Sequence, residues 1–304
     1  MIINKYTWWR RAIIALYSAF PPARHLKNIS PRLKHKRYLR RKNNRTQEID
    51  VSLRETGKFP LFKRVELETF NRCNGTCSFC PVNKHVDTRK PVQMEEALFK
   101  SIIKQLRDLE FRGSLCLYSN NEPLLDNRIF EFLEIARTAL PNATLDLSTN
   151  GILLDSNSYL DLMKTLDGLT IDNYCIDFKF RPNIQKIIDI SSNNEDLDKR
   201  TRITMRYSDE IMTNRGGQAP NKKGDMRKTL PFGCISPTQQ FIIRPDGKLS
   251  LCCNDALGKV TMGDLNEDSI GNIWFGDRYT EIKSKVMKSR EIFDICRACD
   301  TMNS

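Results

Sequence analysis

The sequence predicts an α/β fold in which strands alternate with helices to form a parallel sheet or barrel, followed by a smaller module. Two observations predict it. From Lys63 onward, segments with the two-residue alternation of strands are repeatedly followed by segments with the apolar spacing of helices. After Gly216-Gly217 this order gives way to short strands and turns. We therefore expect an N-terminal extension over residues 1–60, a β/α domain over 61–225 and a C-terminal module over 226–304.

Each element follows from its local pattern. The first strand is RVELETF (64–70), in which apolar and polar residues alternate before the first cysteines. In the C-terminal module, QQFIIRPDGKLSLCC is typical of a hairpin with Pro245-Asp246-Gly247 at its turn. The remaining strands are predicted at 114–119, 144–148, 169–172 and 202–207, and helices at 94–109, 128–139, 159–166 and 184–190.

Polar side chains follow several predicted strands at the point where each strand stops. They are Asn120-Asn121-Glu122 after the second strand, Thr149-Asn150-Gly151 after the third and Asp172-Asn173 after the fourth. The carboxyl ends of parallel strands meet at one edge of a sheet, where β/α proteins place their functional groups. The sequence therefore predicts a functional site at that edge.

The positive charge of the chain is confined to its N-terminal extension. Residues 1–46 hold 13 of the 49 Lys and Arg residues and no Asp or Glu, so the other 36 basic residues face 37 acidic ones. A basic segment beside an aromatic helix suits contact with anionic lipid, and a solvated, disordered arm is the alternative. The nearly neutral body and the lack of a nucleic-acid motif argue against a nucleic-acid partner. The helix is predicted over 6–20, with an apolar side made by Trp8, Trp9, Ile13, Leu16 and Phe20.

The same patterns predict a cytoplasmic protein that contacts the inner face of a membrane peripherally. No segment approaches the ~18 consecutive apolar residues of a membrane span. The run from Ala12 to Phe20 is followed by Pro21 and Pro22 rather than by a small-residue cleavage site, so we do not interpret it as a secretory signal. Disulfides are expected mainly in small secreted domains, and the ten cysteines therefore need another explanation.

Three cysteines follow the first predicted strand in the pattern Cys73-x3-Cys77-x2-Cys80. Three thiolates on one tight loop can hold three irons of a [4Fe-4S] cluster and leave the fourth iron open for an exchangeable ligand. A zinc site is the alternative, but it requires a fourth protein ligand, for which His85 is the nearby candidate. The spacing therefore favours an iron–sulfur cluster that carries out chemistry at its open iron.

CNGTCSFC has the CxxxCxxC form and the strand-end position of the radical S-adenosylmethionine (SAM) superfamily, and residues 63–215 resemble that family in strand order. The resemblance implies an oxidoreductase built on a partial (β/α)6 radical SAM barrel. In the family, SAM binds the open iron and is cleaved reductively to methionine and a 5′-deoxyadenosyl radical, which abstracts a hydrogen atom from the substrate. A flavodoxin- or ferredoxin-type protein is the implied electron donor.

The resemblance extends to individual SAM-binding positions. Phe79 occupies the aromatic position before the third cysteine, which packs near the adenine in the family. Asn120-Asn121-Glu122-Pro123 stands where the family has Gly-Gly-Glu-Pro, with two asparagines in place of the glycines. The third strand ends where the family places polar groups on the SAM ribose or carboxylate. The residues implied to bind SAM are Phe79, Asn121, Glu122, Ser148 and Asn150.

Four further cysteines could saturate a second [4Fe-4S] cluster. Cys234 and Cys252 lie in the predicted hairpin region, and Cys296-x2-Cys299 lies near the end of the sequence. This layout resembles the SPASM/Twitch auxiliary modules of radical SAM enzymes, and the few residues after Cys299 favour the single-cluster Twitch form. A structural zinc site with four cysteine ligands is the alternative, and Cys253 could replace Cys252 as a ligand.

A saturated second cluster is useful where a substrate radical must lose an electron. Twitch enzymes with a similar cysteine layout oxidise a cyclitol alcohol to a ketone, so we expect oxidation or another radical modification of a sugar-like or cell-surface precursor, free or lipid-linked. The alternatives are a peptide- or protein-modifying maturase, a radical epimerase, and a non-catalytic Fe–S or zinc protein. An epimerase requires a spare thiol near the radical, and Cys175 is preferred over Cys116 and Cys253 because it follows the fourth strand.

Two other roles have more than one candidate. A guanidinium for an anionic substrate group could come from Arg206 or from the segment Asn214-Arg215-Gly216-Gly217. A general base could be Asp172 or Asp177, and the sequence does not select between them.

Overall fold

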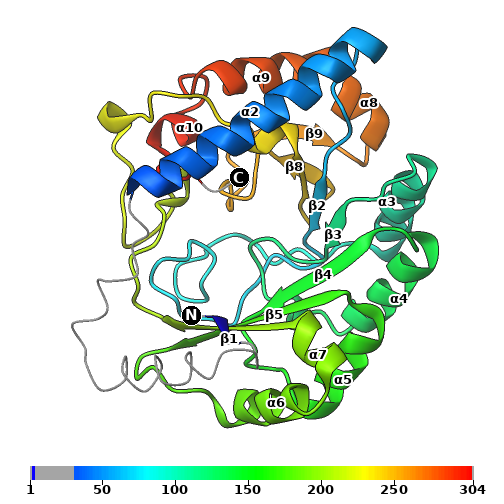
Figure 1. Ribbon diagram of the computed structural model, residues 1–304, viewed down its shortest axis with the longest axis vertical. Coiled ribbons are helices and arrows are strands. Elements are labelled where there is room, and N and C mark those ends of the chain that lie inside the picture. Colours follow the sequence, from blue (N-terminus) through cyan, green and yellow to red (C-terminus); the bar gives the residue numbers. More distant parts are fainter. Residues whose placement is uncertain (1, 4–30, 303–304) are drawn as a thin grey trace.

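The structure is a computed structural model that describes residues 2–3 and 31–302, and the helix predicted at 6–20 lies outside these ranges. The strands within them form one sheet of nine strands (Figure 1). Strands β2 to β6 and β7 run parallel, whereas β1, β8 and β9 pair antiparallel with their neighbours. The order across the sheet is β1 (Ile2–Ile3), β6 (Thr201–Tyr207), β5 (Gly168–Cys175), β4 (Thr144–Thr149), β3 (Ser114–Cys116), β2 (Arg64–Leu67), β7 (Gln240–Ile243), β8 (Lys248–Ser250) and β9 (Thr261–Asp264).

The sixth parallel strand comes from the C-terminal part of the chain. β7 pairs with β2, so that Arg64 lies opposite Gln240 and Leu67 lies opposite Ile243. All four residues of β7 are buried, as expected for an inner parallel strand. The predicted α/β fold with a parallel sheet is confirmed, and the β2–β7 pairing continues this sheet into the C-terminal part.

Helices return the chain between successive parallel strands. α3 buries Phe99 and other apolar residues at helical spacing, and the Phe99 ring stacks on Phe132 of α4 with the ring centroids 4.1 Å apart. α7 was not predicted, because six residues are too few to show a helical period. The helices are α3 (Glu96–Asp108), α4 (Ile129–Ala139), α5 (Ser156–Thr165), α6 (Pro182–Ser192) and α7 (Glu195–Arg200), with short 3-10 turns at Pro123–Leu125, Arg215–Gly217, Met226–Lys228 and Ser236–Thr238.

The predicted hairpin forms between β7 and β8, which pair antiparallel. Gly247 in its turn has φ +82°, a conformation that favours glycine. Behind the hairpin, Trp274 is fully buried and packs edge-on against Phe62 and Phe241. The helices that complete this part are α8 (Ile270–Phe275), α9 (Asp277–Lys288) and α10 (Asp294–Ala298).

The N-terminal extension contains a 26-residue helix, α2 (Pro31–Thr56), where the sequence suggested only a basic run. Figure 1 shows this long helix (blue) crossing the C-terminal part of the chain. Its inner side is anchored by side chains: the Tyr38 hydroxyl donates to the Gly233 carbonyl, and Arg45 donates to the Thr238 carbonyl. The helix was missed because tertiary contacts of this kind, rather than a strong apolar period, stabilise it.

No helix within the described residues is both long enough and apolar enough to cross a bilayer.

Candidate active site

The loop after β2 brings Cys73, Cys77 and Cys80 to the wall of one cavity. Gly75 lies among them, since a Cβ at this position would be 3.3 Å from Cys73 Sγ and 4.0 Å from Cys77 Sγ. Burial raises the pKa of the Cys73 and Cys77 thiols to about 12 and also raises the pKa of Cys80. Buried thiols at this pKa keep their protons unless a metal displaces them, so the loop suits metal coordination better than nucleophilic catalysis.

Glu122 follows β3 and is held at the same cavity by three donors. Its carboxylate accepts from the Thr149 hydroxyl at 2.6 Å, from the Asn150 backbone amide at 2.7 Å and from the Leu124 amide at 3.2 Å. The side chain is 1% exposed, and burial raises the pKa of its carboxyl group. Glu122 is therefore a fixed acceptor that joins the ends of β3 and β4 at the cavity wall.

Asn121 and Asn150 also line the cavity. The Asn121 Oδ1 atom accepts from the Ser119 amide at 3.2 Å, but its Nδ2 group is buried and has no hydrogen-bond partner within the structure. A buried, unpaired donor is costly, and a bound molecule with an acceptor group would satisfy it. Asn150 is more fully engaged, because its Nδ2 donates to Asn74 Oδ1 at 2.7 Å and its Oδ1 accepts from Ile152.

The aromatic residues Tyr118 and Tyr174 also line the cavity, and neither was predicted. Tyr174 of β5 lies against the predicted Phe79 with ring centroids 5.4 Å apart, and Tyr118 lies after β3. Tyr174 is two residues beyond Asp172, and both line the cavity. Two-residue strand periodicity could have identified Tyr174, since alternate residues of a strand face the same side.

Arg215 and Asp172 are the members of the candidate pairs that reach the cavity. Arg215 has φ +50° and donates to Asn120 Oδ1 at 2.7 Å. Burial alone would lower its pKa, but the facing Cys80 and Tyr118 outweigh this effect and raise it. Asp172 accepts from the Thr204 hydroxyl through Oδ1. These two residues supply a cation and an anion on the wall of one cavity.

Several predicted residues do not line this cavity. Ser148 is not among the residues that line the cavity, whereas its neighbour Thr149 is. The Cys175 thiol lies 3.4 Å from Met205 Sδ and 3.6 Å from the Arg206 carbonyl oxygen, outside the cavity. Their proposed roles in SAM binding and hydrogen donation stay predictions. The other residues outside the cavity are Asp177 and His85, which are exposed, and Arg206, which pairs with Glu210 at 3.6 Å.

The second set of cysteines lines a separate cavity formed by Cys234, Cys252, Cys296 and Cys299. Burial, with added repulsion from the neighbouring cysteines, raises the pKa of Cys252 well above its ordinary value. The alternative ligand, Cys253, does not line this cavity.

Cys253 instead connects the two cavities through its carbonyl oxygen. Asn120 Nδ2 donates to it at 3.1 Å, and Arg215 Nη1 donates at 3.4 Å. The Asn120 backbone amide in turn donates to Glu68 Oε1 at 2.6 Å. Because Cys253 follows Cys252 in the sequence, this series of hydrogen bonds connects the wall of the first cavity to a cysteine of the second.

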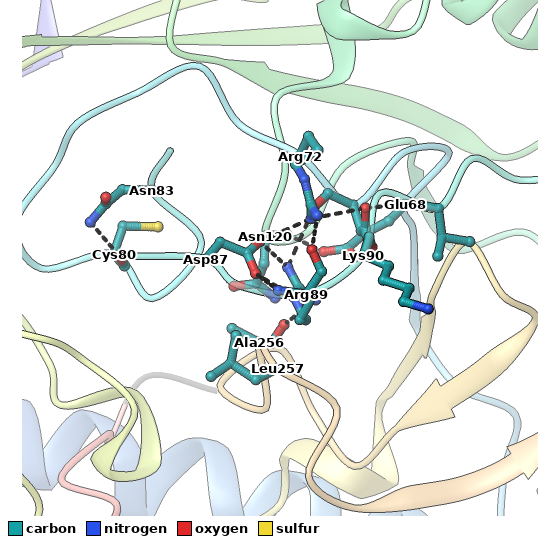
Figure 2. Close-up of polar contacts among 12 residues, drawn as sticks. Glu68, Arg72, Cys80, Asn83, Asp87, Arg89, Lys90, Asn120, Ala256 and Leu257 are labelled. Atoms are coloured by element: carbon teal, nitrogen blue, oxygen red, sulfur yellow. Dashed lines mark hydrogen bonds and ion pairs between the residues drawn. The ribbon is translucent and has the colours of Figure 1, made fainter. Parts of the chain in front are cut away.

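Figure 2 shows a second set of contacts that connects the first cysteine loop to the segment after Cys252. Arg89 pairs with Asp87 at 2.9 Å and donates to the Ala256 carbonyl at 3.1 Å, and Arg72 approaches the same Asp87 at 3.3 Å. Asp87 therefore holds two arginines that fix the end of the cysteine loop. Through Ala256 the same network holds the loop that follows Cys252.

The donor set fits a cluster better than a single ion. Among the described residues, no three His, Cys, Asp or Glu side chains converge closely enough to hold one metal ion. The ligands of a single zinc would all lie about 2.3 Å from it, whereas thiolates on a [4Fe-4S] cluster bind different irons and stand farther apart. Three thiols, an unsatisfied amide and a fixed carboxylate on one wall suit a cluster with SAM beside it, and four thiols elsewhere suit a saturated cluster.

Two family models match the chain. The model described as the Radical SAM superfamily matches residues 67–207. The SPASM model, described as an iron–sulfur cluster-binding domain, matches residues 234–300. The first range contains the cysteines of the first cavity, and the second contains those of the second cavity.

Known proteins resemble the chain over most of its length. It is 26% identical over 246 residues to the S-adenosyl-L-methionine-dependent 2-deoxy-scyllo-inosamine dehydrogenase of Niallia circulans, covering 80% of this chain and 94% of that protein. Its fold matches the crystal structure of BtrN in complex with AdoMet and 2-DOIA with a TM-score of 0.68 at 24% identity, covering 80% and 94% of the two chains. Streptococcus suis SuiB bound to precursor peptide SuiA matches with a TM-score of 0.57 at 15% identity, covering 83% and 73%.

Glu68 gives a testable prediction about pH. Burial raises its pKa to about 7, so the folded protein binds a proton that the unfolded chain releases near the ordinary glutamate pKa of 4.5. Stability should therefore fall as the pH rises from about 4.5 to about 7, and the penalty should persist above that range. Glu68→Gln should stabilise the protein at pH 8 by roughly 1–3 kcal/mol, with little effect at pH 5.

Anaerobic thermal unfolding at the two pH values measures this difference. Glu267→Gln, at an exposed position, is the matched control and should behave like the parent at both. Equal midpoints for Glu68→Gln and the parent at pH 8 would show that Glu68 does not carry a buried charge.

Proposed function

We propose that this chain, which belongs to the radical SAM superfamily, oxidises an alcohol group of a sugar-like small molecule to a ketone. The chain is a radical SAM oxidoreductase with two [4Fe-4S] clusters. When bound, the first cluster and SAM supply an oxidising 5′-deoxyadenosyl radical, and the second cluster supplies an electron acceptor. The observation that supports the proposal most is one cavity wall that combines three thiols with Glu122, Asp172 and Arg215.

Each set of lining residues is assigned to one cluster or to SAM. We assign Cys73, Cys77 and Cys80 to the first cluster, because they are the thiols of that cavity. Glu122 would accept a hydrogen bond from the SAM amino group. The free Asn121 Nδ2 would donate to the carboxylate of SAM. Phe79 and Asn150 would bound the SAM site on other sides. The second cluster is assigned to Cys234, Cys252, Cys296 and Cys299.

Oxidation of a secondary alcohol removes a hydrogen atom, a proton and an electron. We assign the proton to Asp172, the acidic residue besides Glu122 on the cavity wall. Glu122 is occupied by three donors, so it is the poorer base. Arg215 would orient a substrate oxygen through its guanidinium. The Cys253 carbonyl, which accepts from Asn120 and Arg215, would connect this wall to Cys252 on the path of the electron.

Epimerisation is less well supported by the geometry. It requires a spare thiol at the reacting carbon, and the cysteines outside the two sets, Cys116, Cys175 and Cys253, do not line the first cavity. The similarity to peptide-bound SuiB concerns the fold alone and gives no argument for a peptide substrate.

We also propose two external contacts. Reduction of the first cluster requires a one-electron donor of the flavodoxin or ferredoxin type. The outer side of α2 would contact an anionic membrane surface, where lipid-linked sugars are found. Lys36, Arg37 and Arg40 are exposed there, and α2 has no acidic residue in its first turn. Like charges four residues apart weaken a helix, so these cations are better explained by an external partner than by helix stability.

Iron counting and SAM cleavage test the cluster assignment. Anaerobically reconstituted protein should contain about eight irons per chain and release 5′-deoxyadenosine on reduction. Cys77→Ala and Cys252→Ala should each reduce this to about four, but only Cys77→Ala should abolish SAM cleavage. Retained cleavage in Cys77→Ala, or full iron content in Cys252→Ala, would refute the corresponding assignment.

Asp172→Asn tests the proposed reaction. With 2-deoxy-scyllo-inosamine and related aminocyclitols, the parent should form one ketone per 5′-deoxyadenosine. The variant keeps the shape but loses the base, so ketone formation should fall by about 10²–10⁴-fold while cluster content is unchanged. Asp177→Asn is the control and should retain ketone formation. SAM cleavage without any ketone from sugar-like compounds would contradict alcohol oxidation and leave the superfamily assignment intact.

Vesicle flotation tests the membrane contact. The triple variant Lys36→Glu, Arg37→Glu, Arg40→Glu should bind phosphatidylserine vesicles at least about tenfold more weakly than the parent. An equal charge change at exposed Lys84, Lys104 and Lys164 serves as the control and should have a smaller effect. Equal flotation of both triple variants, or no binding by the parent, would contradict the proposed contact.

A further inference from the structure

Arg290 is a buried cation in the second cavity. Its side chain is 2% exposed and lines the cavity together with Cys234, Cys252, Cys296 and Cys299. The guanidinium donates to three backbone carbonyls: Nε to Phe232 at 3.3 Å, Nη1 to Cys299 at 3.3 Å and Nη2 to Thr301 at 2.9 Å. Within residues 31–302 it forms no ion pair with an Asp or Glu, which is unusual for a buried arginine.

The carbonyl groups solvate this charge but do not neutralise it. A buried charge without a counter-ion is strongly unfavourable, so an anion is expected nearby. The cysteines that interact most strongly with the Arg290 charge are Cys234 and Cys299. As thiols they are neutral, whereas four thiolates around a [4Fe-4S] cluster give a site with net negative charge that grows when the cluster gains an electron.

We infer that Arg290 is a positioning residue for the second cluster, which it retains and whose reduction potential it raises by acting as a buried counter-charge. The inference rests on the proposed function, because it requires a cluster at Cys234, Cys252, Cys296 and Cys299. A nearby cation stabilises the more negative, reduced state of a cluster more than the oxidised state. Net charge and solvent exposure are among the factors that set cluster potentials.

Helix α2 strengthens this effect by covering Arg290. The guanidinium lies 5.8 Å from the centre of the Phe232 ring, and Tyr38 of α2 packs against the same ring with centroids 5.0 Å apart and interacts electrostatically with Arg290. The Tyr38 hydroxyl donates to the carbonyl of Gly233, the residue before Cys234. Water is thereby kept from the guanidinium, so solvent screens its charge little.

A redox titration of the second cluster tests the inference. The parent for this experiment is the full chain with Cys73→Ala, Cys77→Ala and Cys80→Ala, which leaves one cluster to observe by electron paramagnetic resonance. Arg290→Gln should shift the midpoint potential to more negative values and speed cluster loss to a chelator. Arg290→Lys keeps the charge and should shift the potential less. Arg297→Gln removes a half-buried cation that is already paired with Asp294 close to Cys296, and should leave the potential nearly unchanged.

The potential and the cluster content of the Arg290 variants decide between the possible roles of Arg290. An Arg290→Gln protein with a full cluster and the parent potential would overturn the inference. If Arg290→Gln cannot hold the cluster, retention by Arg290→Lys at an equal thermal midpoint supports the counter-charge, and equal loss in both variants overturns it. A parent that binds no iron at all would instead refute the second cluster, and with it the proposed function of this module.

Discussion

The parallel pairing of β2 with both β3 and β7 is the interaction on which both cavities depend. β2 leads into the cysteine loop, β3 leads into Asn120 and Glu122, and β7 leads through the hairpin to Cys252. A register slip of one residue would turn each of these strand ends to the opposite face. The distance between the proposed SAM site and the proposed auxiliary cluster is therefore set by main-chain hydrogen bonds, not by a flexible linker.

Much of the fold and of the first cavity follows from local sequence patterns. The alternation in strands such as β5 and the spacing of Cys73, Cys77 and Cys80 are visible without tertiary information, and the strand-end rule placed Glu122 and Asn150 at the cavity. The assignment of Ser148 to the SAM site stays a prediction. Ser148 and Thr149 are neighbours, and sequence alone does not decide which of two adjacent residues at a strand end lines a cavity.

Other features depend on contacts between residues far apart in the sequence. Arg215 reaches the first cavity because a turn with positive φ redirects the chain, and Arg290 reaches the second because α9 packs against the segment before Cys234. Helix α2 carries too weak an apolar period to be predicted, yet Tyr38 and Arg45 fix it to the C-terminal part of the chain. Such residues became identifiable only when burial and hydrogen-bond partners were known.

Buried charge is the common theme of these positions. Glu122 is a buried carboxyl group on the wall of the first cavity, and Glu68 is a buried carboxyl group that accepts from the Asn120 amide beside it. Arg290 is a buried guanidinium group beside the second cysteine set, and the half-buried Arg215 lies beside the first. In a low-dielectric interior such groups act strongly on any charged cofactor close to them. They therefore connect the fold to redox chemistry more directly than the exposed charges of α2 do.

In the proposed arrangement, only the cluster at Cys73, Cys77 and Cys80 has an iron open to SAM. Electron paramagnetic resonance of the reduced, two-cluster protein with and without SAM tests it most directly. SAM should change one of two cluster signals and leave the signal from the Cys234, Cys252, Cys296 and Cys299 site unaltered. Signals that do not respond to SAM, or a response from the second site, would contradict it.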